Sequence, residues 1–195
     1  MSKIRAAITA VEGYVPDYIL TNDELSRMVD TNDEWIMTRI GIKERRILKG
    51  EKGPSDMAEV VVKRILEKKN LSPDSIELVI CCTVTPDMVF PATANVIAHK
   101  CGIKHGFGFD VNAGCSGFIY GLTTASKYIE SGFVKRALVI GAEKMSAIVN
   151  YEDRATCPIF GDGAAGVLLE ATEEPYGLMD EILCSDGEGV KHLHQ

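Results

Sequence analysis

The segment FDVNAGCSGFIYGL (109–122) places a cysteine where nucleophilic chemistry would be favoured. The apolar run at 107–111 predicts a strand, and helical periodicity extends over 117–129. Cys115 therefore lies on a sharp strand-to-helix turn, in which Gly114 relieves the crowding. A thiolate at a helix N-terminus is stabilised by free N–H groups and by the helix dipole, and its own backbone N–H can help to form an oxyanion hole. We therefore predict that Cys115 is a nucleophile and not a structural thiol.

The remaining cysteines show no such placement. Buried free cysteines usually act as small hydrophobes, and this interpretation fits Cys81, Cys82, Cys101 and Cys184. None of the six cysteines forms a C-x-x-C pair or a Cys/His ligand spacing, so we expect no metal site. The cysteine usage is that of a reduced protein, which favours a cytoplasmic location.

Composition narrows the function classes. The 195 residues have 46% hydrophobic and 25% charged content, as expected for one large globular domain. The net charge of −7 gives no basic signature of a nucleic-acid-binding protein. The apolar run near the N-terminus is too short for a signal peptide or a membrane span. Neither nucleic acid nor a membrane is therefore expected as a partner.

Strand and helix patterns alternate along the chain. Thr21 and Thr31 each open a Thr-x-x-Glu capping box and so predict a helix start, and Ser55 is the expected N-cap of an amphipathic helix at 54–70. The run IELVICCTVT (76–85) is typical of a strand that is buried on both faces. Further elements are expected as strands at 4–11, 107–111, 134–143, 166–171 and 178–187 and as helices at 91–102 and from Gly117 onward. This βαβα order predicts an α/β fold with a mostly parallel sheet covered by helices.

Two further patterns have ordinary explanations. GDGAAG (161–166) matches G-x-G-x-x-G, but a strand follows it in place of the helix whose N-terminus would bind phosphate. We interpret it as a tight glycine turn that leads into a central strand. The basic run KERRILKGEK (43–52) is interpreted as an exposed strand and loop, although a positive patch there could also attract an anionic ligand.

Three segments together resemble β-ketoacyl-acyl-carrier-protein synthase III, the initiating condensing enzyme of dissociated fatty acid synthesis. They are DTNDEWIMTRIGIKERRI (30–47), NAGCSGFIYGL (112–122) and DRATCPIFGDGAAGVLLEA (153–171). The likeness runs through the whole chain, and Ser116 stands where many members have alanine. The resemblance implies the thiolase fold, of which residues 1–195 would form one βαβαβ-type half, the N-terminal half of a longer enzyme.

The resemblance implies an acyltransferase that performs a ping-pong Claisen condensation. The thiolate of Cys115 would attack a short acyl-CoA and release CoA. Malonyl-acyl-carrier protein would then lose carbon dioxide, and its carbanion would attack the acyl-enzyme. Acyl-CoA is thus expected as a substrate, malonyl-acyl-carrier protein as a partner, and no permanently bound cofactor or metal is expected. A homodimer is also implied.

The resemblance also assigns binding residues. The residues that match the family's CoA contacts are Thr31, Trp35, Arg39 and Arg154, with adenine between Trp35 and Arg154. Phe160 matches a residue beside the active-site cysteine, and Phe90 matches the phenylalanine that lines the partner's acyl pocket across the dimer interface. An aromatic face and a guanidinium suit a base, while further cations meet phosphates. Without the resemblance, Trp35 could be a core residue, Thr31 a helix cap and Phe160 a packing residue.

The family completes its active site with a histidine and an asparagine from the C-terminal half. The four histidines of this chain do not match that motif: His99 and His105 flank a helix end, and His192 and His194 lie in a polar tail. We therefore expect the C-terminal half of the same protein as a partner of residues 1–195. Other classes stay open, namely an α/β cysteine hydrolase, another thiolase-superfamily condensing enzyme, or a non-catalytic half that docks a complementary subunit.

Overall fold

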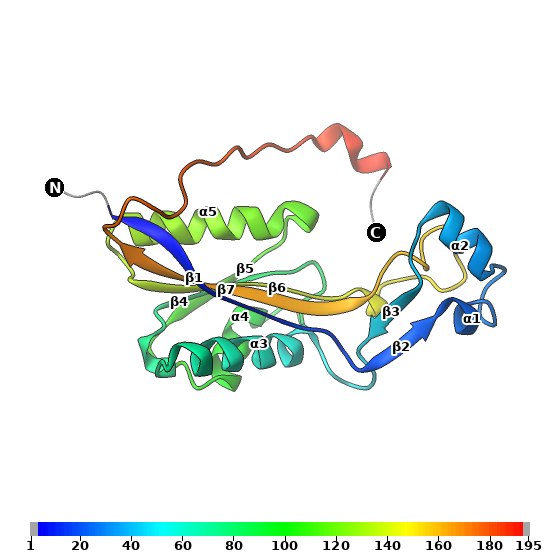
Figure 1. Cartoon of the computed structure of the whole chain (residues 1–195), viewed down its shortest axis with the longest axis horizontal. Helices are drawn as coiled ribbons and strands as arrows, with labels where there is room; N and C mark the ends of the chain where they lie inside the picture. Colours follow the sequence, from blue (N-terminus) through cyan, green and yellow to red (C-terminus); the bar gives the residue numbers. More distant parts are fainter. Residues whose placement is uncertain (1–3, 193–195) are drawn as a thin grey trace.

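The computed structural model describes residues 4–192, and a five-stranded sheet forms their centre (Figure 1). The strands, in the order β1-β7-β6-β4-β5 across the sheet, are β1 (Arg5–Tyr14), β7 (Asp162–Thr172), β6 (Arg136–Lys144), β4 (Leu78–Cys82) and β5 (Phe107–Val111). β4 pairs in parallel with β5 and β6, whereas β7 is antiparallel to both β6 and β1. Four of these five strands therefore run in one direction, and the expected mostly parallel sheet is confirmed.

Residues 78–144 form the expected βαβαβ unit. β4 leads into α4 (Thr93–Lys100), then β5, then α5 (Gly117–Glu130) and then β6. All five residues of β4, LVICC, are buried, because the strand has a neighbour on each side and helices above and below. α5 covers one face of the sheet, and α4 covers the other together with α3 (Pro54–Lys69), as Figure 1 shows.

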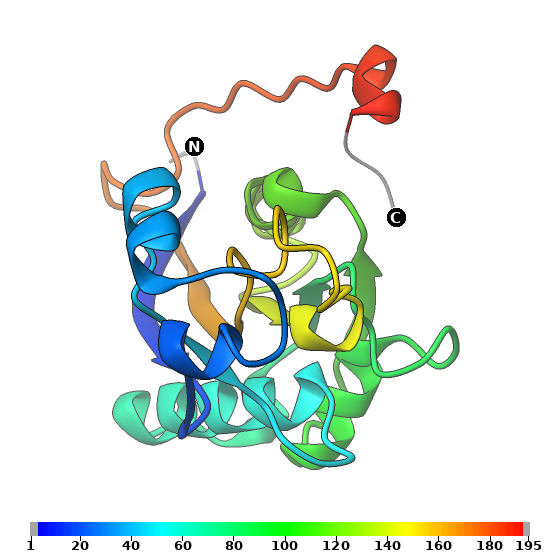
Figure 2. The ribbon, with the colours of Figure 1, turned by 90° about the vertical axis from the view of Figure 1, so that its right-hand side faces the viewer.

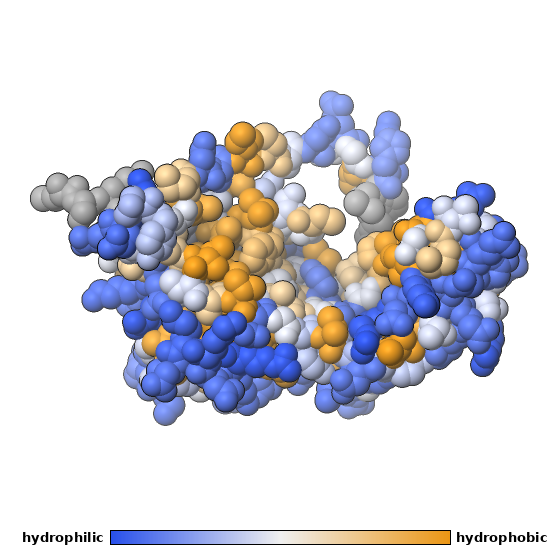
Figure 3. All heavy atoms as spheres, viewed as in Figure 1, coloured by the Kyte–Doolittle hydropathy of each residue, from blue (hydrophilic) through white to orange (hydrophobic). Residues whose placement is uncertain are grey.

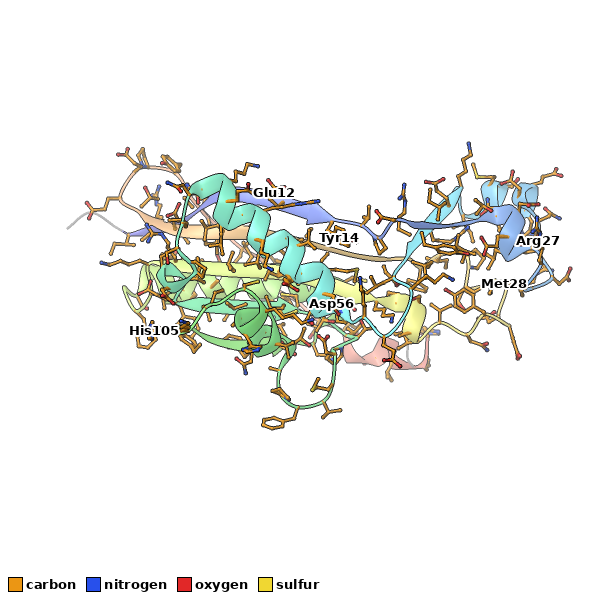
Figure 4. The ribbon with its side chains drawn as sticks, turned by 90° about the horizontal axis from the view of Figure 1, so that it is seen from below. Glu12, Tyr14, Arg27, Met28, Asp56 and His105 are labelled. Atoms are coloured by element: carbon orange, nitrogen blue, oxygen red, sulfur yellow. The ribbon has the colours of Figure 1, made fainter. Side chains whose placement is uncertain are left out.

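α3 lies along β1 on its face of the sheet (Figure 4). The Arg64 guanidinium carbon is 5.9 Å from the centroid of the Tyr14 ring, and Lys68 Nζ is 2.8 Å from Glu12 Oε1. The predicted apolar stripe of this helix is confirmed, since it buries Met57, Val61 and Ile65. Burial of this stripe on the sheet fixes the orientation of the helix.

A smaller unit follows β1 at one end of the sheet. It contains a two-stranded antiparallel sheet of β2 (Tyr18–Thr21) and β3 (Glu44–Ile47), with the short helices α1 (Asn22–Leu25) and α2 (Asp33–Arg39) between them in the chain. Its own small core contains Leu20, Leu25, Ile36, Ile47 and Cys157. Cys157 belongs to the segment that follows β6, so this core attaches that segment to α2.

The helix starts agree with the capping prediction at one position out of three. Thr21 caps α1, as predicted. α2 is capped by Asn32 instead of Thr31, and α3 begins after Gly53 instead of Ser55. Asparagine is at least as good an N-cap as threonine, and the proline that opens α3 prefers the first helical position, which moves the cap to Gly53.

The glycine-rich segment GDGAAG is mostly strand and not the predicted turn, because β7 already begins at Asp162. A Cβ on Gly166 would lie 3.2 Å from atoms of Val61, Val139 and Ile140. This glycine therefore allows α3 and β6 to pack closely against β7. The same strand excludes a dinucleotide-binding turn at this position, as expected.

The predicted strand at 178–187 is wrong. This segment leaves the edge of the sheet and passes over α5 (Figure 1). The Leu178 N–H donates to the Ala6 carbonyl at 2.8 Å, and the Tyr120 hydroxyl donates to the Cys184 carbonyl at 2.8 Å. Ile182 is 88% exposed. A strand needs a neighbouring backbone ladder, and a helix surface offers none.

Gly121 allows α5 to approach β4 closely. A Cβ on Gly121 would lie 2.5 Å from Cys82 Sγ and 3.2 Å from Val139 Cγ1, inside normal contact distance. Both neighbours lie on buried strands of the sheet centre. A side chain at this position would therefore push α5, and the turn before it, away from the sheet.

We predict that Gly121→Ala lowers the free energy of unfolding by ~1–3 kcal/mol, the usual cost of overpacking, although alanine is the better helix former. Urea unfolding measures the change. Gly117→Ala is the matched control, because the nearest atoms to its added Cβ are 3.6 Å away, and no destabilisation is expected from it. The cost of Gly121→Ala should shrink in a Cys82→Ala background, and equal costs in both backgrounds would contradict this packing explanation.

Candidate active site at the carboxyl edge of the sheet

The predicted site residues follow strands that end at one edge of the sheet. Strands with a common direction place their carboxyl ends together, and β1, β4, β5 and β6 share that direction. Phe90 follows β4, Cys115 follows β5, and Arg154 and Phe160 follow β6. Trp35 belongs to the smaller unit that follows β1. Figure 2 looks onto this edge, with α1 and α2 in front of the sheet.

Cys115 lies on the turn between β5 and α5, as predicted. Residues Gly114–Ser116 form a single 3-10 turn, and Gly114 has a φ of +53°, a left-handed conformation that favours glycine. The Cys115 side chain is exposed. The Ser116 and Gly117 N–H groups donate to the Ala113 and Gly114 carbonyls. No side chain caps α5, so the N–H groups that follow in its first turn have no side-chain partner and can attract an oxyanion. These are the features that a thiol nucleophile requires.

Burial separates four other cysteines from Cys115. Burial raises the pKa of Cys82 to about 12 and that of Cys101 to about 11, and it also raises the pKa values of Cys81 and Cys157. These thiols are protonated at neutral pH. Cys184 is exposed, which contradicts the prediction of a buried thiol, because the strand expected around it does not form.

Two arginines lie against the ring of Trp35. The guanidinium carbon of Arg39 is 5.1 Å from the ring centroid, and that of Arg154 is 4.8 Å away. Arg39 follows Trp35 by one helical turn of α2, whereas Arg154 comes from the segment after β6. Arg154 is held by Asp30, since its Nη1 lies 3.2 Å from both the carbonyl oxygen and Oδ2. Three of the four predicted CoA-binding residues are thus in one cluster.

The fourth predicted CoA contact, Thr31, precedes α2 and follows Asp30 in the chain. Its Oγ1 is buried and has no hydrogen-bond partner within the described residues, and only Arg5 has another such atom there. A buried hydroxyl without a partner is unfavourable. The Thr31 hydroxyl therefore lacks a partner, and a ligand group could pair with it only if the atoms that cover it moved.

The distance between Trp35 and Arg154 leaves no room for a base. Two stacking gaps of ~3.5 Å each require ~7 Å between ring and guanidinium, and the observed distance from the ring centroid is 4.8 Å. An adenine could enter between them only if Arg154 moved away from Trp35. Such a movement also breaks its contact with Asp30, whose side chain is 98% exposed.

The two predicted pocket residues lie in different surroundings. Phe90 is 87% exposed, at the tip of the loop between β4 and α4, beside the equally exposed Val89. A side chain this exposed packs against little of residues 4–192 and is therefore available to contact another molecule. Phe160 is half-buried and immediately precedes Gly161 and β7.

Sequence analysis missed Arg45. The basic run at 43–52 was expected to be exposed, but Arg45 is only 3% exposed. Its Nε donates to the Pro158 carbonyl at 2.7 Å, and its Nη1 donates to Asn22 Oδ1 at 2.6 Å. Burial lowers the pKa of the guanidinium. The alternation within Glu44–Ile47 was an available signal, because it places Arg45 on the same face as the buried Ile47.

Asp162 is a second missed residue. Its carboxylate is 4% exposed and accepts hydrogen bonds from the Leu48 N–H at 2.7 Å, the Ser146 N–H at 2.8 Å and the Ser146 hydroxyl at 2.6 Å. It therefore joins the segment after β3 to the segment after β6. No local pattern distinguishes Asp162 from a surface carboxylate in the sequence.

His105 does not approach Cys115 through the sheet. His105 precedes β5 and lies at the opposite end of that strand from the Cys115 turn, far from Arg27 and Met28 in Figure 4. Among residues 4–192, no group of three or more His, Cys, Asp or Glu side chains could hold a metal ion. No helix in this part of the chain is both long and apolar enough to cross a bilayer.

Comparison with known proteins agrees with this geometry. Residues 109–187 match the family model described as 3-oxoacyl-[acyl-carrier-protein (ACP)] synthase III. The chain is 57% identical over 195 residues to a β-ketoacyl-[acyl-carrier-protein] synthase III of Phocaeicola vulgatus, covering 100% of this chain and 58% of that protein. The chain is therefore similar over its whole length to β-ketoacyl-acyl-carrier-protein synthase III proteins.

Solved structures of synthase III proteins share the fold. The match to the Thermus thermophilus protein has a TM-score of 0.90 and 38% identity, and it covers 96% of this chain and 58% of that chain. The match to the Aquifex aeolicus protein has a TM-score of 0.83 and 47% identity, with coverage of 87% and 55%. The expected resemblance to synthase III proteins and the thiolase-like α/β fold are therefore confirmed. The chain spans 58% of the Phocaeicola protein's length.

We predict that iodoacetamide at neutral pH alkylates Cys115 before any other cysteine of this chain. The buried thiols should react slowly, because the pKa of Cys82 is about 12 and the pKa of Cys101 is about 11. Cys184 is the internal reference, because it is exposed but lies outside a helix N-terminus. Timed peptide mapping measures the order. Equal alkylation rates at Cys115 and Cys184 would show that the position at a helix N-terminus does not raise the reactivity of Cys115 above that of another exposed thiol.

A further prediction concerns the contact between Asp30 and Arg154. Trp35 is the only tryptophan, so its fluorescence reports on this site alone. Asp30→Asn should make Trp35 more accessible to acrylamide, because Arg154 loses the carboxylate that holds it near the ring. Salt at ~1 M should produce a similar increase in the unchanged protein, since exposed charges are then strongly screened.

Asp23→Asn serves as the matched control for Asp30→Asn. Asp23 is also an exposed carboxylate paired with an arginine, Arg27, but it lies in α1 and not beside Trp35. Acrylamide quenching that changes equally in both variants would contradict a specific role of Asp30.

Proposed function

We propose that this protein is an acyltransferase that catalyses the initiating Claisen condensation of a short acyl-CoA with malonyl-acyl-carrier protein. The observation that carries the proposal is the 57% identity to a synthase III over all 195 residues. The exposed Cys115 at the start of α5 is the residue on which the chemistry depends. In this proposal the protein acts in the cytoplasm and needs neither a metal nor a bound cofactor.

The first chemical step is acyl transfer to Cys115. Its thiolate attacks the carbonyl carbon of acyl-CoA, a new C–S bond forms, and the C–S bond to CoA breaks. CoA leaves as a thiolate that takes up a proton. The oxyanion of the tetrahedral intermediate would accept hydrogen bonds from the N–H groups at the start of α5, and each such donor typically contributes ~10²–10³ in rate.

The second step forms the carbon–carbon bond. Malonyl-acyl-carrier protein loses carbon dioxide, and the electron pair of the broken bond becomes a carbanion. The carbanion attacks the acyl carbonyl on Cys115, and the Cys115 thiolate leaves. Charge develops on the malonyl thioester oxygen in this step, and the resemblance assigns its stabilisation to a histidine and an asparagine that have no match in this chain.

The cluster around Trp35 supports recognition of CoA in the first step. Trp35 would stack on the adenine, Arg39 and Arg154 would meet the phosphates and the base, and Thr31 would use its otherwise unpartnered hydroxyl. Arg154 moves from its contact with Asp30 when the base enters. Phe160 would lie beside the acyl group on Cys115.

We propose that residues 1–195 act as the N-terminal half of the enzyme, with the histidine and asparagine supplied by a C-terminal half. Apolar side chains on the face that Figure 3 shows, over β1 and α5, support a contact of this kind. Exposed apolar residues of these two elements include Ile8 and Val11 of β1 and Ile119 of α5, which are 51%, 56% and 48% exposed. The exposed Phe90 loop supports a homodimer, in which Phe90 would reach the partner's acyl pocket.

Labelling with acetyl-CoA tests the first step. We expect one acetyl group on Cys115 that hydroxylamine removes, no label in Cys115→Ser, and unchanged labelling in the control Cys184→Ser. Peptide mapping locates the label. An acetyl group that is shared equally between Cys115 and Cys184 would reject the assigned nucleophile.

The condensation is tested with the complete gene product. We expect carbon dioxide release and acetoacetyl-acyl-carrier protein from acetyl-CoA and malonyl-acyl-carrier protein, with no product from Cys115→Ser. A complete protein that is acetylated on Cys115 but forms no condensation product would overturn the proposed reaction while leaving the nucleophile intact.

A further inference from the structure

Arg45 connects three segments behind the Trp35–Arg154 pair. It lies on β3 and is 3% exposed. Its Nε donates to the Pro158 carbonyl at 2.7 Å, four residues after Arg154 in the chain. Its Nη2 donates to the Ile42 carbonyl at 3.3 Å. One side chain thus attaches the segment that carries Arg154 to the strand that follows α2.

Asn22 extends this connection to α2. It is 2% exposed and accepts from Arg45 Nη1 at 2.6 Å. Its own Nδ2 donates to Asp33 Oδ1 at 2.7 Å and to the Ile42 carbonyl at 3.0 Å. Asp33 is the first residue of α2, two residues before Trp35. The chain of hydrogen bonds therefore runs from the Arg154 segment through Arg45 and Asn22 to the helix of Trp35.

Close packing at Gly161 is a second attachment of the same segment. A Cβ on Gly161 would lie 3.1 Å from the Arg46 carbonyl oxygen and 3.4 Å from Arg45 Cβ. Backbone thus lies directly against backbone where the Arg154 segment meets β3. An added methyl group would push the two apart without removing any hydrogen-bonding group.

We propose that Arg45 is a positioning residue for CoA binding, which sets the spacing between Trp35 and Arg154. The inference rests on the proposed function, because CoA is the ligand whose base would enter that spacing. Arg45 itself does not line the Trp35 ring, and its donors are occupied by the protein. Its effect on the ligand is therefore indirect, through the relative placement of α2 and the Arg154 segment.

A merely structural role for Arg45 predicts a different result. Loss of a buried arginine would lower stability, but a protein that still folds would bind CoA normally. A positioning role predicts weaker CoA binding in the folded variant, because sub-ångström to ~1 Å misplacements of a binding group can cost up to ~10²-fold. Arg45→Lys keeps the charge and loses the fork that reaches Pro158 and Asn22 together.

The test uses the single tryptophan, Trp35, as the probe. CoA is titrated into the unchanged protein, Arg45→Lys and Gly161→Ala at a temperature at which circular dichroism shows each to be folded. We expect the Kd for CoA to rise roughly tenfold in both variants. In the condensation catalysed by the complete gene product, the KM for acetyl-CoA should rise with it, while kcat at saturating acetyl-CoA stays unchanged, because the reacting Cys115 is untouched.

Arg46→Lys is the matched control. Arg46 is the next residue on β3 and faces the opposite way. Its side chain makes long hydrogen bonds to the Pro16 carbonyl at 3.3 Å and the Asp17 carbonyl at 3.4 Å, and its Nη2 lies 3.8 Å from Glu44 Oε1. The Kd of the Arg46→Lys variant for CoA should equal that of the unchanged protein. If Arg45→Lys does not fold, Gly161→Ala decides the question, since it retains Arg45.

An unchanged Kd in either folded variant would overturn the proposal, as would a fall in kcat with KM unaltered. Failure of the unchanged protein to bind CoA would instead overturn the proposed function. Acrylamide quenching of the ligand-free protein would then still test the spacing, since Trp35 should become more accessible in Arg45→Lys and Gly161→Ala but not in Arg46→Lys.

Discussion

The parallel pairing of β4 on both of its edges constrains the rest of the molecule. A strand with parallel neighbours on each side must be covered on both faces and reached by crossover helices. β4 meets this requirement with five buried residues, with α4 and α5 as the crossovers to β5 and β6. Because these strands end together, the Phe90 loop, the Cys115 turn and the Arg154 segment all begin at the same edge.

Hydrogen bonds from buried polar groups, and not the main apolar core, join the segments at that edge. Arg45 ties β3 itself, and Asp162 ties the segment after β3, to the region after β6. A buried charged or polar group is stable only when its partners are in place. Such groups therefore select one relative placement of Trp35 and Arg154, whereas apolar side chains would tolerate small shifts.

Electrostatic effects act at two places in the site: on the protonation of the cysteine thiols and on the contact between Arg154 and Trp35. Burial keeps the thiols of the sheet protonated, whereas the thiol of Cys115 at the edge of the sheet is exposed. Arg154 lies over the Trp35 ring and beside Asp30, so its guanidinium covers the ring, and in the proposed function a base would replace it. Two weak interactions, a cation–π contact and an exposed ion pair, hold this covered state. A ligand with an aromatic base and phosphates can replace both.

Local signals in the sequence by themselves determined the βαβαβ order, the apolar stripe of α3, the buried strand LVICC and the strand-to-helix turn at Cys115. Each depends on residue period or on a glycine that the backbone requires, so neighbours in the chain suffice to specify it. Tertiary structure alone decided the burial of Arg45, the bridge made by Asp162 and the closed contact of Trp35 with Arg154. It also decided that residues 178–187 form no strand. These outcomes depend on hydrogen-bond acceptors, partner strands and an aromatic ring that distant segments supply. A local sequence pattern does not tell which distant segment will supply them.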